Sequence, residues 1–251
     1  LRMVDSSSKP RRRSGGGRAN RIAAQQATTG NEAVRGGLSG GRYRPLSELD
    51  MENINQAALT ILENTGLADH FQELLDIVLP KGAFLNAHDR LCFPRALMED
   101  ILAGAAKEFY VHARGERAGK DDMHCTAESV YFANSGTAVT TFDAKNKSYR
   151  PSDLRDIYDF TRLVDRLENI HMLGDTVLAT DVVDDFAHDM NTVYAILAGS
   201  QKPACITFRD RSHIAPAIRL FDHASGGEGS FMKKPSVIFG GCPIVSPLRI
   251  G

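Results

Sequence analysis

The sequence predicts an α/β fold whose C-terminal region is the first part of a (β/α)8 barrel. Three apolar runs, at 169–174, 204–208 and 236–241, are typical of parallel strands buried on both faces. Segments with helical patterning separate them, and the strand starts at 170, 204 and 236 are 34 and 32 residues apart. A barrel of ~250 residues uses about 31 residues per unit. Because only three such strands precede Gly251, we expect a truncated barrel, the front part of a larger enzyme.

The helices of this region, residues 151–251, are predicted from caps and apolar spacing. Ser152 is a candidate N-cap for a helix that leads into the first strand. The crossover helices are expected at about 184–198 and 211–224. Their inward-facing residues are expected to be Phe186, Met190, Val193, Tyr194 and Leu197 in one, and Ile214, Ile218 and Leu220 in the other.

The preceding region, residues 42–150, is predicted to mix helices with strand hairpins. Ser47 is a candidate N-cap for a helix that ends near Gly66, with apolar residues at helical spacing between them. Further helices are expected at 69–79 and 94–106, and strands at 91–93 and 109–113. Two strands, 130–133 and 138–142, are expected to pair around the turn 134–136.

Residues 1–41 form a basic tail rich in Gly and Arg, which we expect to be disordered because it has little apolar material to bury. The net charge of −1 for the whole chain argues against a nucleic-acid-binding protein. No run approaches the ~18 apolar residues of a membrane span, and the first residues lack the apolar core of a signal peptide. The four cysteines have no C-x-x-C spacing, which favours reduced thiols and a cytoplasmic protein.

Several stretches, in this order, resemble the trimethylamine methyltransferase family, the MttB-like proteins. They are 40–47 (GGRYRPLS), 57–66 (AALTILENTG), 110–114 (YVHAR), 136–143, 149–156 (YRPSDLRD), 163–171 (LVDRLENIH) and 246–248 (SPL). Each is weak alone, and together they extend over nearly the whole chain.

The resemblance implies a TIM-barrel enzyme that takes a methyl group from trimethylamine or from a quaternary amine such as glycine betaine. The acceptor in that family is the Co(I) centre of a separate small corrinoid protein, so no cofactor is expected to bind this chain directly. Some members carry pyrrolysine in the later part of the barrel. The catalytic residues are therefore expected beyond Gly251, and a homo-oligomer is left open.

Candidate substrate-binding residues follow from the rule that barrel enzymes place their chemistry at the C-terminal ends of the strands. The rule nominates Asp175, Phe208, Arg209, Gly240 and Cys242, with His171 also considered. A carboxylate and an aromatic face suit a methylammonium cation, and glycine lets a ligand approach the backbone.

Each of these residues also has a purely structural interpretation. Asp175 could cap the next turn, Phe208 could belong to the core, and His171 could be a hydrogen-bonded core histidine. Arg209 could pair with Asp210 or Asp181 at the rim.

Other chemistries lack their motifs. His188 and Asp189 have no second histidine at the spacing of a metal motif, and His124 with Cys125 lacks zinc-type spacing, so no metal is expected. The sequence has no G-x-S-x-G, no G-x-G-x-x-G after a strand and no Walker A sequence. The alternative function is that of a non-catalytic, truncated protein-interaction module.

Overall fold

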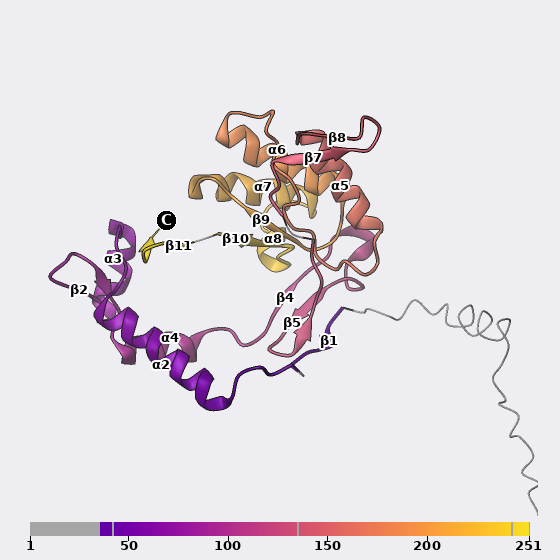
Figure 1. The fold of residues 1–251 in the computed structure, drawn as a ribbon. Coiled ribbons are helices and arrows are strands. Elements are labelled where there is room, and N and C mark those ends of the chain that lie inside the picture. Colours follow the sequence, from indigo (N-terminus) through magenta and orange to yellow (C-terminus); the bar gives the residue numbers. More distant parts are fainter. Residues whose placement is uncertain (1–35, 42, 135, 242, 251) are drawn as a thin grey trace, which may run out of the picture. The chain divides into compact units, whose positions relative to one another are not determined.

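The computed structural model describes residues 36–41, 43–134, 136–241 and 243–250, and it combines helices with small sheets (Figure 1). The helices are α2 (Glu48–Asn64), α3 (Gln72–Val78), η1 (Leu79–Lys81), α4 (Arg95–Gly104), η2 (Gly115–Arg117), α5 (Leu154–Arg166), α6 (Asp185–Gly199), η3 (Arg211–His213), α7 (Ile214–Ala224) and α8 (Ser230–Lys233). Each sheet among the described residues has two strands, and none closes into a barrel. None of the helices in those ranges is long and apolar enough to cross a bilayer.

The three predicted parallel segments lie side by side in chain order. Strand β9 (Ala204–Thr207) pairs in parallel with β10 (Val237–Gly240), from Ala204 opposite Val237 to Thr207 opposite Gly240 (Figure 1). The first segment is reduced to a parallel bridge between Leu173 and Ala204, supported by the bond from the Cys205 N–H to the Leu173 carbonyl at 2.7 Å. The predicted parallel arrangement of the three segments is therefore confirmed, although the first segment is not a regular strand.

The helices beside these strands enclose the main apolar core. Ile157 and Val164 of α5, Val193 and Ile196 of α6, and Phe221 of α7 are buried together with Leu173, Ile206 and Val237. The prediction for α6 is wrong at two positions, because Phe186 is 47% exposed and Tyr194 is 66% exposed. Met190, Val193 and Leu197 of α6 and Ile218 and Leu220 of α7 belong to the core or pack against it, while Ile214 is half-buried and outside it.

Helix α5 begins one residue later than predicted. Its N-cap is Asp153, whose Oδ1 accepts the Asp156 N–H at 2.9 Å, while Asp156 Oδ2 accepts the Asp153 N–H at 3.0 Å. Ser152 is instead buried, and its hydroxyl donates to the Leu178 carbonyl at 2.7 Å. The carboxylate pair forms a capping box, which satisfies two backbone donors that a single hydroxyl would leave unpaired.

The helices predicted before residue 107 are present. Ser47 caps α2 through a capping box with Asp50, and a small core of Leu75, Val78, Ala83 and Leu91 lies between α3 and the hairpin of β2 (Phe84–Leu85) and β3 (Leu91–Cys92). Helix α2 buries only Leu59, so its predicted apolar stripe stays uncovered among the described residues, with Ile54 57% exposed.

The strand pairing predicted around the turn at 134–136 is wrong. Strand β6 (Ser129–Val130) pairs with β1 (Leu38–Ser39), and β7 (Thr140–Asp143) pairs with β8 (Ser148–Pro151). Ala133 and Ala138 instead form parallel bridges to Met172 and Val177. The reason lies in Asn134, whose side-chain amide exchanges two 3.0 Å hydrogen bonds with the backbone of Gly174 and so holds the chain along residues 172–177.

Two predicted boundaries also move. Order extends back to Gly36, because β1 gains backbone hydrogen bonds to β6 that require no apolar side chain; residues 1–35 lie outside the described residues. The third strand ends at Gly240, and β11 (Ile244–Val245) turns back to pair with β12 (Arg249–Ile250). The Ala68 N–H donates to the Leu248 carbonyl at 2.9 Å, which ties this hairpin to the segment after α2, while β10 pairs only with β9 among the described residues. The remaining hairpin joins β4 (Phe109–Val111) to β5 (Met123–Cys125).

Lys202 joins α5 to the strand that follows α6. Its ammonium is buried and donates to the carbonyls of Val164, Leu167 and Ile170 at 2.8, 2.7 and 2.6 Å. Burial lowers the pKa of Lys202, and the nearby Arg117 lowers it further. The ammonium thus gives a further donor to the carbonyls at and just after the C-terminal end of α5, where the regular helical hydrogen bonds run out.

We expect Lys202→Met to lower the free energy of unfolding by roughly 1–3 kcal/mol, because buried carbonyls lose their donors. The control is Lys107→Met, which removes an exposed lysine that donates to a single helix carbonyl, that of Leu102 at 2.8 Å. Its effect should stay within about 0.5 kcal/mol. Urea denaturation measures both, and equal effects would refute the structural role of Lys202.

Candidate functional site

The C-terminal ends of the three parallel segments meet at Asp175, Thr207 and Gly240. Asp175 Oδ2 accepts the backbone N–H of Thr207 at 2.8 Å, and Thr207 lies opposite Gly240 in the strand register. A Cβ placed on Gly240 would lie 3.3 Å from Cys205 Sγ, so the glycine keeps this edge clear. The structure therefore brings together two of the predicted site residues, Asp175 and Gly240, through Thr207, which the sequence did not single out.

One carboxylate oxygen of Asp175 is available as a hydrogen-bond acceptor. Its Oδ1 is buried and has no hydrogen-bond partner among the described residues. Burial raises the pKa of Asp175, the bond from Thr207 lowers it in part, Asp189 raises it further and His188 lowers it. A buried carboxylate oxygen without a partner is unfavourable unless a donor or a cation meets it. Asp175 is thus prepared to interact with a cationic or hydrogen-donating ligand.

A second buried carboxylate, Asp189 on α6, lies close enough to Asp175 to affect its pKa. Asp189 Oδ2 accepts the Arg209 backbone N–H at 2.9 Å and lies 2.7 Å from His213 Nδ1. His188 Nδ1 lies 3.2 Å from Asp189 Oδ1, and His188 Nε2 is buried without a partner in the described part of the chain. This network holds the start of α7 against α6 behind Asp175.

The sequence singled out His188 and Asp189 only to reject them as a metal motif. Among the described residues, no group of three or more His, Cys, Asp or Glu side chains is arranged to hold a metal ion, and the absence of a metal stays a prediction. These two polar residues lie on the inward face of an amphipathic helix, and that position was a signal in the sequence for a buried hydrogen-bond network. His213 carried no such signal, because its partner is far away in the sequence.

Arg209 lies beside this network, but its predicted partners are wrong. Its Nη1 lies 2.5 Å from Asp185 Oδ1. Asp210 instead caps η3 by accepting the Ser212 N–H at 2.7 Å, and Asp181 accepts the Leu154 N–H at 2.9 Å. Both alternatives fail because backbone donors already engage their carboxylates.

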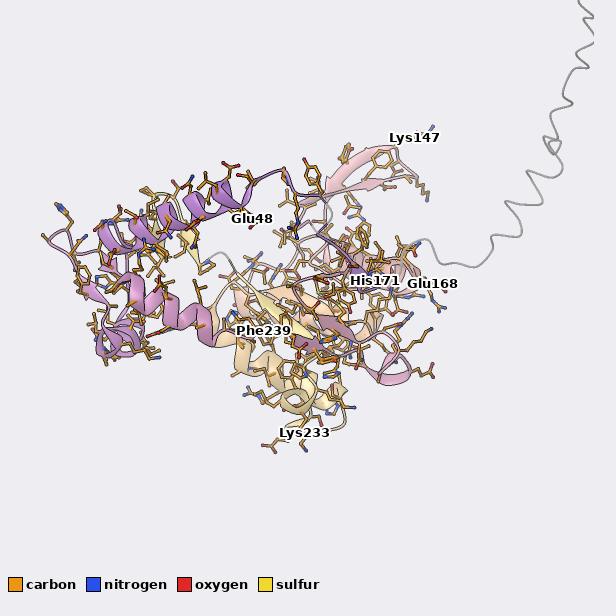
Figure 2. All side chains as sticks on the ribbon, turned by 90° about the horizontal axis from the view of Figure 1, so that it is seen from below. Glu48, Lys147, Glu168, His171, Lys233 and Phe239 are labelled. Atoms are coloured by element: carbon orange, nitrogen blue, oxygen red, sulfur yellow. The ribbon has the colours of Figure 1, made fainter. Side chains whose placement is uncertain are left out.

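Phe208 packs on the core. Its ring centroid lies 5.2 Å from that of Phe239, with the rings 69° apart, and Phe239 lies 6.0 Å from Phe231. Figure 2 shows Phe239, which lies on β10. The core interpretation of Phe208 is confirmed, and its contact with a cation stays a prediction. Cys242 lies outside the described residues.

His171 lies at the start of its segment rather than at the end (Figure 2). Its Nδ1 accepts the Phe132 N–H at 2.9 Å, and its Nε2 is buried with no partner in the described ranges. Burial lowers the pKa of His171, and the charge of Lys202 lowers it further. The hydrogen bond agrees with the structural interpretation considered from the sequence, although His171 is half-buried and not part of the apolar core.

Comparisons with known proteins agree on one family. The family model described as trimethylamine methyltransferase (MTTB) matches residues 11–251. The trimethylamine methyltransferase MttB of Desulfitobacterium hafniense (strain DSM 10664 / DCB-2) is 26% identical over 205 residues, which are 81% of this chain and 40% of that protein. The glycine betaine methyltransferase of Desulfitobacterium hafniense (strain Y51) is 20% identical over 197 residues, 78% of this chain and 40% of that protein. The chain thus matches 40% of the length of each curated relative.

The opposite pKa directions of two carboxyls predict opposite pH trends. Asp175 has a raised pKa, so its ionisation costs stability as the pH rises above its unfolded value near 3.8. Hydrogen bonds from Arg150 lower the pKa of Asp156, so Asp156 adds stability above that value and the gain is lost as the pH falls.

Relative to the parent chain, Asp175→Asn should therefore gain stability between pH 4 and pH 7, since the amide never ionises. Asp156→Asn, its matched control, should be less stable than the parent by a constant amount over this interval, and its deficit should shrink only as the pH falls below about 3.8. Urea denaturation at several pH values measures both trends. If Asp175→Asn follows the pH trend of Asp156→Asn, the assignment of Asp175 as a buried carboxyl with an unpaired oxygen is wrong.

Proposed function

Because the chain belongs to the trimethylamine methyltransferase family, we propose that it is the front part of an enzyme that takes a methyl group from a methylated amine. The donor is trimethylamine or a quaternary amine such as glycine betaine. The observation that carries the proposal is the buried, unpartnered Oδ1 of Asp175 at the C-terminal ends of the parallel segments.

The electrostatics of Asp175 suit such a donor. A quaternary ammonium has no N–H, so it is held by negative charge and aromatic faces rather than by hydrogen bonds. Asp175 Oδ2 already accepts from Thr207, which fixes the carboxylate and leaves Oδ1 for the ligand. Burial alone disfavours the charged form of the carboxylate, and a bound cation would favour it.

The proposed architecture is the first three units of a (β/α)8 barrel. Three parallel segments in chain order, with α6 and α7 as crossovers, support it. The remaining strands would complete the mouth around the amine, exclude water and align the methyl carbon between nitrogen and acceptor.

The proposed acceptor is the Co(I) corrinoid of a separate small protein, which supplies the nucleophile. The methyl carbon would bond to the acceptor as the carbon–nitrogen bond breaks with its electron pair kept by nitrogen, so a quaternary ammonium leaves as a neutral tertiary amine and needs no general acid. Trimethylamine would react as its N-protonated ammonium and leave as neutral dimethylamine. This chain's own residues would then bind and orient the amine, without moving a proton at the reacting centre.

The interaction-module alternative is supported by the apolar side chains on α2. Leu49, Met51, Ile54 and Ile61 are exposed in the described structure, and such surface often contacts another chain or domain. A pull-down with the corrinoid protein, run on the preparation used for the methyl-transfer assay, separates binding without turnover from catalysis.

The test compares this chain with a version extended by the barrel part that the relatives possess. With Co(I) corrinoid protein and either amine, we expect methyl transfer by the extended version only, followed as loss of Co(I) absorbance. Correct positioning of reactants can be worth ~7–11 kcal/mol of barrier, and an open site loses it. Turnover by the 251-residue chain alone would refute the requirement for a complete barrel. An extended version inert across a panel of methylated amines would refute the function.

In the extended version, Asp175→Asn should raise the KM for the amine about tenfold or more, which corresponds to about 1.4 kcal/mol of lost cation binding. The control Asp159→Asn removes a carboxylate that is paired with Arg155 on the exposed face of α5, and it should leave KM unchanged. An unchanged KM in Asp175→Asn with intact methyl transfer would place the amine elsewhere.

A further inference from the structure

A cavity of about 280 Å³ lies at the other ends of the parallel strands, away from Asp175. It is lined by residues that include Arg114, Ser225, Ser230, Lys233 and Lys234. The serines and lysines precede β10 in the chain, and Arg114 is bonded to residues that precede β9. The cavity is therefore distinct from the edge that carries the proposed methylamine site.

Arg114 forms no ion pair with a described carboxylate. Its backbone N–H donates to the Gln201 carbonyl at 2.7 Å, and its Nη2 donates to the Ser200 carbonyl at 2.5 Å. Its Nε is buried and has no partner among the described residues. Burial lowers the pKa of Arg114 to about 10, so the guanidinium remains charged at neutral pH. A buried charge without a counterion is costly, and an anion in the cavity would offset that cost.

The rest of the lining points to the same kind of ligand. Ser225 Oγ is buried without a hydrogen-bond partner in the described residues, and a hydroxyl is ready to donate to an anion. Lys233, labelled in Figure 2, and Lys234 are both exposed. No ion pair joins either of them, or Arg114, to a described carboxylate.

Glu116 and Glu228 also lie near the lining in the sequence, and neither forms an ion pair among the described residues, while Asp222 on α7 is already engaged by backbone donors. Asp222 accepts the Phe231 N–H at 2.8 Å and the Gly229 N–H at 3.1 Å, and so holds the loop before α8. Because its carboxylate binds the loop backbone, Asp222 does not neutralise the lysines. The described lining therefore combines a buried guanidinium, two ammonium groups and two hydroxyls.

We propose that this cavity binds the phosphate group of a small molecule. A planar guanidinium with a free Nε–H suits phosphate oxygens, and lysines and serine hydroxyls complete a donor set for a tetrahedral anion. The volume, slightly below the ~300 Å³ of small-ligand pockets, fits a phosphate with a short substituent rather than a nucleotide. The site stands independently of the methyl-transfer proposal.

Inorganic phosphate is the probe. Isothermal titration of the 251-residue chain at pH 7.5, with ionic strength held constant by chloride, should show saturable binding at one site. Succinate at the same ionic strength serves as the comparison anion and should bind more weakly. No saturable phosphate binding, or tighter binding of succinate, would overturn the proposal.

Ser225→Ala is the decisive variant, because a purely structural role and a binding role predict different results. Removing a buried hydroxyl without a partner should leave the melting temperature equal or higher in chloride, while phosphate affinity falls about tenfold, as expected for a lost hydrogen bond to a charged group. Unchanged affinity would contradict the site. Arg114 is less suitable for mutation, since its bond to Ser200 makes it part of the fold.

The double variant Lys233→Gln/Lys234→Gln should also weaken phosphate binding about tenfold or more. Its control, Lys81→Gln/Lys145→Gln, removes the same charge from exposed positions outside the cavity lining. Equal losses in both double variants would show that net charge, and not this cavity, attracts phosphate.

Discussion

The parallel pairing of three short segments determines where the chemistry of this protein can lie. Thr207 is opposite Gly240 because β9 and β10 are paired from their first residues, and Asp175 reaches the Thr207 N–H because Leu173 is bridged to Ala204. A shift of one residue in a strand turns each side chain to the opposite face of the sheet. The position of Asp175 is therefore a consequence of backbone register rather than of any contact that its own side chain could impose.

The two ends of these segments have opposite electrostatic character. The C-terminal ends carry Asp175, with Asp189 behind it, while the residues before the strands include Arg114, Lys233 and Lys234. Neither buried charge is fully neutralised, since Asp175 Oδ1 and Arg114 Nε both lack partners in the described chain. Buried polar atoms are normally satisfied, and exceptions concentrate at functional sites. A single fold thus presents one environment suited to a cation and another suited to an anion.

Local features could be predicted from the sequence, and pairing partners could not. The N-cap at Ser47 and the positions of α4 and α6, to within two residues at each end, follow from residues close together in the chain. The hairpin expected around Asn134 failed because the side chain of Asn134 bonds to Gly174, a contact between distant residues. The same limit applies to the site. The rule that barrel enzymes place their sites at strand ends predicted Asp175 and Gly240. Thr207 and His213 could be identified only once the strand register and the packing of α7 were known.

The raised pKa of Asp175 links ligand charge to pH. Burial favours the neutral carboxyl, and a cation at Oδ1 would favour the carboxylate, so binding and proton release are coupled. Asp189 increases this coupling, because a second carboxylate nearby makes ionisation of Asp175 harder in the free protein. A permanently charged amine would bind more tightly as the pH rises through the pKa of the free carboxyl. A neutral donor of the same shape would lack that dependence, since it offers the carboxylate no charge in return. A ligand site at Asp175 would therefore discriminate by charge, through a residue that exchanges no proton with its ligand.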